Sequence, residues 1–366
     1  MIPQGKYRIM AFKDFVPDWL RFTILLLLTL VFQFSNSIYL TNLNEVIGGK
    51  ALTSEDVKLI CAASFIGMTM IFPILFRIKF RFMSRTILLS AAAVIIIGNI
   101  ISMYSDNVLI LLVTSFIVGA FKMIGTFECL SSIQLVITPK RDFTVFFSVV
   151  YLIVLGSIQV SGLLTAKISY LFNWQYMHIL IVGLQLIFMI LIYCLMRPIR
   201  LMKQCTLYQI DWLGMGLWTL VLTLLNFIFE YGKLLDWLDS HYIKIAIVAS
   251  LILLICAVQR MFGIRRPLIM PEIFKYKNLI KALLLLIVLQ IFLSTSSVIL
   301  NVYIGGILHY NILHSTSLNW IVFFGVILGA AFSLYWMSIY RGNYKTIFLI
   351  GFSAFVLHQL ILYFIF

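Results

Sequence analysis

Charged residues are scarce in this chain of 366 residues: Asp, Glu, Lys and Arg together make up 11%, and only 13 residues are acidic. Hydrophobic residues make up 63%, and the mean hydropathy is +1.08. Soluble domains carry about 25% charged residues. Disordered chains have a low content of apolar residues. The composition therefore excludes both classes and indicates a membrane protein.

Cysteine is also rare, and the sequence carries no nucleotide motif. The five cysteines, none of them in a loop expected outside the cell, are Cys61, Cys129, Cys194, Cys205 and Cys256. They imply no disulfide framework and show no metal-ligand spacing, so we expect neither a metal nor a cofactor. A Gly-x-x-x-x-Gly-Lys-Ser/Thr phosphate loop is missing, which argues against direct use of ATP.

About eleven apolar stretches are long enough to cross a bilayer, since about 20 residues span its hydrocarbon core. They lack the alternation of lipid-facing strands, and only a helix satisfies its own backbone in lipid. The sequence therefore predicts an all-α polytopic membrane protein. The expected spans are 19–40, 59–76, 86–103, 108–137, 143–168, 177–195, 212–229, 243–258, 279–300, 318–336 and 347–366.

The loops between these stretches alternate in charge. Most of the 27 Lys and Arg residues precede the first span or follow the second, fourth, sixth, eighth and tenth. The intervening loops hold six acids: Glu45, Glu55, Asp56, Asp106, Asp236 and Asp239. The positive-inside rule then places the N-terminus in the cytoplasm, which in a bacterium means the inner membrane. Topology also explains the net charge of +14, so we expect the lipid bilayer and no nucleic acid as partner.

Two ionisable residues, Lys122 and Glu128, lie inside the fourth predicted span. Such groups are functional candidates at membrane depth, either for binding substrate charge or, for Glu128, for carrying a proton. They lie about 120° apart around a helix, so we expect each to have its partner elsewhere. The alternative is a structural ion pair or a side chain that snorkels to the interface.

Polar residues also recur at helical spacing. Gln290, Ser294, Ser297 and Asn301 share one face of the ninth span, where we favour the lining of an aqueous cavity over hydrogen bonds between helices. In the fifth span Gln159 lies among small residues, Ser161 and Gly162 included, which favour close helix packing.

Several patterns resemble the major facilitator superfamily. The stretch 76–85, with Arg81 and Arg85, stands where that superfamily has a basic loop between spans two and three. The segment 161–166, beginning Ser161-Gly162, resembles its antiporter motif without the proline, and Asn173-Trp174-Gln175 resembles its Ser/Asn-Trp-Arg.

The segment from Asp211 to Ser240 is similar to the central helix pair of the fourteen-span drug:proton antiporters of the EmrB/QacA type. It opens with Asp211-Trp212-Leu213-Gly214 and continues through Glu230-Tyr231-Gly232-Lys233. The resemblance implies an N-terminal six-helix bundle over 1–205, a two-helix insert over 206–262 and a second bundle over 263–366. It also implies proton-coupled efflux of small amphipathic compounds by alternating access, with a periplasmic adaptor and an outer-membrane channel as partners.

The chain departs from that family at several places. Ser35-Asn36-Ser37 replaces an Asp-x-Thr pattern, and Ser115 replaces an arginine before Gly119. The second bundle has three spans where the family has six, which predicts a truncated product or a fragment. A transport-inactive remnant is therefore the main alternative function. An intramembrane lipid-modifying enzyme ranks lower, because His178, His241, His309, His314 and His358 are scattered.

Overall fold

A computed structural model describes residues 11–34, 38–138, 142–199, 207, 210–339 and 344–365. The regular elements in these ranges are helices, which confirms the all-α prediction. The α-helices are α1 (Asp18–Phe34), α2 (Ile38–Thr41), α3 (Leu43–Lys50), α4 (Ser54–Ile71), α5 (Leu75–Arg81), α6 (Ser84–Tyr104), α7 (Val108–Ile137), α8 (Phe143–Leu171), α9 (Tyr176–Leu195), α10 (Trp212–Tyr231), α11 (His241–Gly263), α12 (Lys277–Val302), α13 (Ile312–Leu334) and α14 (Tyr344–Ile365).

Nine helices of the described residues are long and apolar enough to cross a membrane, so the chain is a multi-pass membrane protein. They coincide with the second to tenth predicted spans. The first predicted span falls on α1, which has 17 residues, and on the short α2. The last falls on α14, whose described apolar stretch is Lys345–Ile361. Ser35-Asn36-Ser37 lies outside the described residues.

The second span is longer than hydropathy predicts, because a cap starts its helix before the apolar run and the chain stays helical beyond Pro73. Thr53 Oγ1 accepts a hydrogen bond from the Asp56 backbone N–H, and the Asp56 carboxylate accepts one from Thr53 N. This capping box starts α4 at Ser54. Pro73 lies in a 3₁₀ turn, Phe72–Ile74, after which α5 carries the chain on to Arg81.

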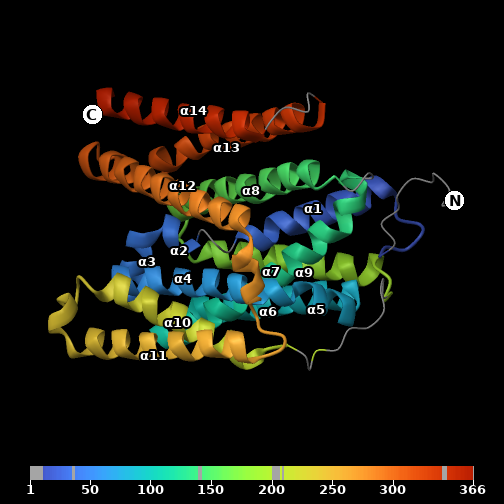
Figure 1. The fold of residues 1–366 in the computed structure, drawn as a ribbon. Helices are drawn as coiled ribbons and strands as arrows, with labels where there is room; N and C mark the ends of the chain where they lie inside the picture. Colours follow the sequence, from blue (N-terminus) through green and yellow to red (C-terminus); the bar gives the residue numbers. More distant parts are fainter. Residues whose placement is uncertain are drawn as a thin grey trace.

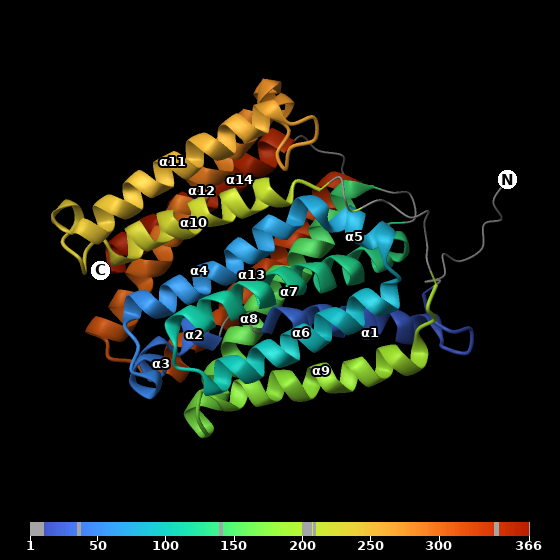
Figure 2. The same ribbon diagram turned by 90° about the horizontal axis from the view of Figure 1, so that it is seen from below.

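Helices α1 to α9 form one bundle, with the other helices on its flanks. Figure 2 shows α11, α10, α4, α7, α6 and α9 following one another across the molecule, and each neighbouring pair is in contact. The hairpin of α10 and α11 lies against α4, whereas α13 packs against α8 on the other flank (Figure 1). Helix α1 lies inside the bundle, in contact with α7, α8 and α9.

The bundle is closed where the chain enters α1 and leaves α9. Lys13 N donates to Leu195 O, and Arg197 N donates to Ala11 O, both at 2.9 Å. The buried Arg21 side chain donates to the backbone oxygens of Val16 and Lys13 at 2.8 and 2.9 Å. A buried guanidinium is tolerated only when such acceptors replace water, so Arg21 fixes the segment before α1 to the bundle.

Two glycines let α4 and α7 pack backbone to backbone. A Cβ on Gly67 would collide with the Phe116 carbonyl oxygen, and a Cβ on Gly119 would collide with the Ser64 carbonyl oxygen. Small residues at a crossing allow this approach, which is a main source of packing energy between helices in lipid. The pair α4–α7 is therefore held by the shape of its backbones.

We expect Gly119→Ala to separate α4 from α7, because its methyl group meets main-chain atoms that have no rotamer to change. The cost should be about 1–3 kcal/mol, the usual range for overpacking. Thermal unfolding of the purified protein in detergent measures it. Gly183→Ala in α9 is the matched control, since nothing lies within 4 Å of its Cβ position. An equal melting temperature for both variants would contradict the tight crossing.

Candidate functional site

Polar side chains follow one another along α7 inside the apolar bundle. Ser115, Lys122, Thr126 and Glu128 are all buried, Lys122 completely. Ser115 and Lys122 are two helical turns apart and share one face of α7, about 10 Å from each other along its axis. We call these four residues the α7 polar row.

Lys122 lies against the end of α1. Its Nζ donates to the Gln33 carbonyl oxygen at 3.5 Å, and the Gln33 amide donates to Thr126 Oγ1 at 3.1 Å. Ser161 of α8 donates to the neighbouring Phe34 carbonyl oxygen at 2.9 Å. The last carbonyls of a helix are without partners in their own helix and carry partial negative charge, so they suit an ammonium group.

Glu128 has a charged partner on α5. Its Oε2 lies 3.4 Å from Lys79 Nζ, and Ser132 Oγ donates to its Oε1 at 3.3 Å. Lys79 also donates to Ser131 Oγ. The expectation that Glu128 has a partner outside α7 is thus met, and that partner comes from the stretch of residues 76–85 singled out in the sequence.

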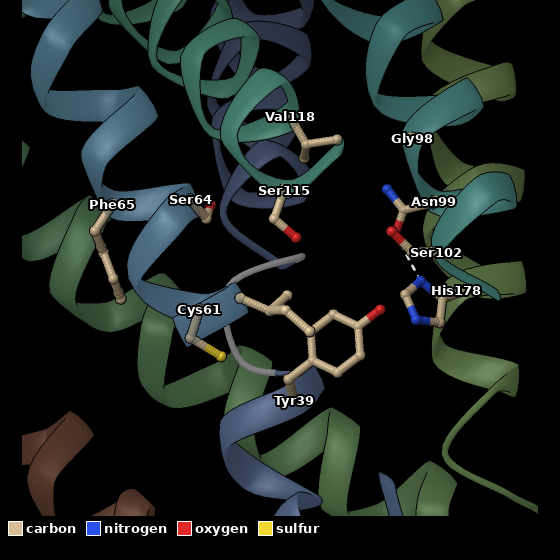
Figure 3. Close-up of a pocket in the computed structure, with 11 residues that line it drawn as sticks. Tyr39, Cys61, Ser64, Phe65, Gly98, Asn99, Ser102, Ser115, Val118 and His178 are labelled. Carbon is tan, nitrogen blue, oxygen red and sulfur yellow. Dashed lines mark hydrogen bonds between the residues drawn. The ribbon is translucent and has the colours of Figure 1, made fainter. Parts of the chain in front are cut away.

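A small pocket opens beside the same helix, nearer the end where α6 stops and α9 begins. Its volume is about 30 Å³. Figure 3 shows the Tyr39 hydroxyl directed across it toward Asn99 and His178. Its lining, drawn from α2, α4, α6, α7 and α9, comprises Tyr39, Ile60, Cys61, Ser64, Phe65, Gly98, Asn99, Ser102, Ser115, Val118 and His178.

Aromatic rings cover this pocket toward the loops. The rings of Tyr39 and Trp174 lie with their centroids 5.8 and 5.9 Å from that of His178. Lys50 Nζ lies 5.6 Å from the centroid of the Trp174 ring, within cation–π distance. Lys50 in turn lies 3.1 Å from Asp106 and donates to the Ser105 carbonyl at 2.6 Å.

A carboxylate fixes α3 at this end of the bundle. Ser169 of α8 donates a hydrogen bond to Glu45. Burial raises the pKa of the Glu45 carboxyl above its ordinary value. The end of the bundle that covers the pocket therefore contains one neutralised pair, Lys50 with Asp106, and one carboxylate whose charge is disfavoured.

The structure does not bring the other sequence candidates into this region. Gln159 of α8 is half-buried, whereas Gln290, Ser294 and Ser297 are exposed on α12. The Asn301 side chain lies outside the described residues. The predicted cavity lining of the ninth span thus stays a prediction, because none of these residues lines the pocket described here.

The motif-like residues have structural partners. Arg81 ends α5, and the Arg85 guanidinium lies 4.3 Å from the centroid of the Tyr193 ring of α9. Ser161 bonds to α1, as described above, and a Cβ on Gly162 would lie 2.9 Å from the Asn319 side-chain nitrogen of α13. Arg85, Ser161 and Gly162 therefore lie at contacts between helices.

Asp211 and Gly214 organise the α10–α11 hairpin. The Asp211 carboxylate caps α10 by accepting from Gly214 N at 2.9 Å, and it accepts from Arg260 Nε of α11 at 2.8 Å. A Cβ on Gly214 would collide with this carboxylate. The Asp-x-x-Gly spacing is thereby explained as a helix cap that also pairs with a neighbouring helix.

Sequence reasoning did not find Tyr39, Asn99, Ser102 and His178 as a group. Asn99 and His178 are polar residues in the mainly apolar helices α6 and α9, a weaker signal than the ionisable groups that singled out Lys122 and Glu128. Their proximity is a property of the tertiary fold, because 79 positions separate them in the sequence.

The described residues contain no group of three His, Cys, Asp or Glu side chains able to hold a metal ion. No protein-family model matches the sequence, and no curated protein matches it. The function has to be argued from the α7 polar row and the pocket beside it.

We expect Gly214→Ala to displace the Asp211 carboxylate, so that α10 loses its cap and Arg260 its partner. Loss of an N-cap costs about 0.5–2 kcal/mol. The matched control is Gly216→Ala in the same helix, where nothing lies within 4 Å of the Cβ position. Unfolding in detergent should separate the two variants. A Gly216→Ala protein as unstable as Gly214→Ala would contradict the assignment of the loss to the collision with the Asp211 cap.

A double-mutant cycle on Lys79 and Glu128 should show strong coupling. Lys79→Met leaves a carboxylate that is 1% exposed without its cation, and breaking a buried pair costs about 3–5 kcal/mol. Glu128→Gln in the same molecule should restore much of that loss. The pair Lys58–Glu230, at 3.8 Å with Lys58 42% exposed, is the control and should couple by less than about 1 kcal/mol. Equal coupling in the two cycles, measured by denaturation, would show that burial does not strengthen the first pair.

Proposed function

We propose that this protein is a secondary active transporter that exports small amphipathic compounds by proton-coupled alternating access. The observation that carries the proposal is the α7 polar row, with Lys122 and Glu128 buried in the middle of an apolar bundle. Ionisable groups are costly at membrane depth and mark ion or substrate pathways.

The junction between α8 and the C-terminal helices supports the alternating-access part. Gly156 and Gly162 of α8 face Phe323 and Asn319 of α13, and Ser148 and Ser333 form a hydrogen bond of 3.2 Å across the same contact. Small residues give a smooth surface on which two groups of helices can slide. Alternating access requires one group of helices to rock against another around a central site.

The sequence resemblance adds the remaining parts of the proposal. It favours the major facilitator superfamily, a location in the bacterial inner membrane and a cytoplasmic N-terminus. It also favours protons as the coupling ion and, as partners, a periplasmic adaptor and an outer-membrane channel. In this scheme Glu128 carries the proton and Lys122 responds to substrate charge.

One observation favours a second candidate, a membrane protein without transport activity. Glu128 is already paired with Lys79, and Lys122 already bonds to α1. Both charges then serve to hold the bundle together, as buried ion pairs do elsewhere. Only a measurement of flux separates these readings.

The test is transport by the full chain in proteoliposomes with an imposed pH gradient and ethidium as the fluorescent probe. We expect gradient-dependent ethidium movement, and a rate lowered about tenfold or more by Glu128→Gln and by Lys122→Gln, equivalent to about 1.4 kcal/mol or more in the limiting barrier. Lys167→Gln, an exposed site on α8, is the matched control and should keep the original rate. Melting temperatures show whether each variant is folded.

Absence of ethidium movement by the unaltered protein would contradict the transport proposal. Unchanged rates in folded Glu128→Gln and Lys122→Gln proteins would retain transport but remove the roles assigned to these two residues.

A further inference from the structure

The hydrogen bonds around Asn99 decide which nitrogen of His178 carries the proton. Asn99 Nδ2 donates to the Ile95 carbonyl oxygen at 2.8 Å. A carbonyl only accepts, so this bond fixes the orientation of the amide and leaves Asn99 Oδ1 as an acceptor. Oδ1 lies 2.9 Å from His178 Nδ1, which must therefore be the donor. In the neutral ring, Nε2 then holds the lone pair.

No hydrogen-bond donor among the described residues reaches this lone pair. His178 is 2% exposed, and Nε2 makes no hydrogen bond within the described part of the chain. The ring contacts the rings of both Tyr39 and Trp174, and the ammonium group of Lys50 lies over Trp174. Nε2 is thus a buried acceptor that a ligand has to satisfy.

The pocket in front of the ring is of the right size and chemistry. A water molecule needs about 10–15 Å³ of such space, and the pocket has about 30 Å³. Its lining adds the hydroxyl groups of Tyr39, Ser102 and Ser115, which both donate and accept. Figure 3 shows these side chains converging on the pocket. The pocket therefore fits a group of one or two heavy atoms with a proton to donate.

We propose that this pocket is a binding subsite for a small hydrogen-bond donor, with His178 Nε2 as the acceptor. The donor is water when the site has no substrate, and a hydroxyl or amino group of the transported molecule when it has one. The binding of a substrate group rests on the proposed transport function, whereas the binding of water does not. Asn99 acts as a positioning residue, because it sets the tautomer of the ring.

The first experiment needs no transport. The full chain, labelled with ¹⁵N-histidine and reconstituted in lipid nanodiscs, is studied by NMR, with the His178 signals assigned by their loss in His178→Gln. We expect a neutral Nδ1–H tautomer, an Nε2 that accepts a hydrogen bond, and magnetisation transfer from water to the ring. Asn99→Leu should give a mixture of tautomers. His358 of α14, which is exposed and outside the pocket, is the internal control.

An Nε2–H tautomer, a doubly protonated ring at neutral pH, or a ring without contact to water would overturn the proposal. The same tautomer in Asn99→Leu would remove the positioning role of Asn99.

The second experiment distinguishes substrate from water. Ethidium carries amino groups, and the same phenanthridinium dye without them serves as the matched probe. We expect His178→Phe to lower the transport rate of ethidium about five- to tenfold relative to that of the second dye. A loss of this size corresponds to about one neutral hydrogen bond. Equal slowing of both dyes would overturn the substrate half. If neither dye is moved by the unaltered protein, the transport function fails, while the NMR result still decides the subsite.

Discussion

The charged and polar groups of α7 lie among apolar side chains, where neither lipid nor bulk water can satisfy them. Each therefore depends on a partner from another element, and these partners fix the arrangement of the bundle. Lys79 of α5 forms an ion pair with Glu128, and the Gln33 carbonyl at the end of α1 accepts a hydrogen bond from Lys122. Removing Lys79 leaves the buried Glu128 carboxylate without its cation, which costs more than the contact itself supplies. The bundle is thus organised around α7 by the need to satisfy its charges as much as by apolar burial.

This requirement connects features that are far apart in the sequence. Lys79 reaches Glu128 because α5 continues α4 after the turn at Pro73, and because α4 packs backbone to backbone on α7. That close packing needs Gly67 and Gly119. A wider separation of α4 and α7 would lengthen the Lys79–Glu128 distance and open the pocket, since Ile60 and Ser64 of α4 line one side of it. The two glycines, the ion pair and the pocket volume are therefore consequences of one helix crossing.

The sequence predicts the helices well, because the length of an apolar run is a local property that lipid imposes on each helix separately. It also identifies Lys122 and Glu128, since a charge in an apolar run stands out by itself. It does not predict Tyr39, Asn99 and His178 as a site, because their contacts join α2, α6 and α9 and carry no local pattern. Periodicity places Gln290, Ser294 and Ser297 on one face of α12 but does not say what that face meets. In the structure they are exposed.

The size of the pocket constrains how the protein can act on a bulky compound. About 30 Å³ accepts a hydroxyl or an amino group and excludes an aromatic ring, so the body of an amphipathic molecule has to lie elsewhere. Enlarging the pocket from the α4 side would separate Lys79 from Glu128, at the cost of a buried charge. The contact between α8 and α13 carries no such charge among the interactions described, and it is lined by Gly156 and Gly162. For the alternating access that we propose, opening at α8 and α13, with the α7 polar row kept intact, therefore has the lower cost.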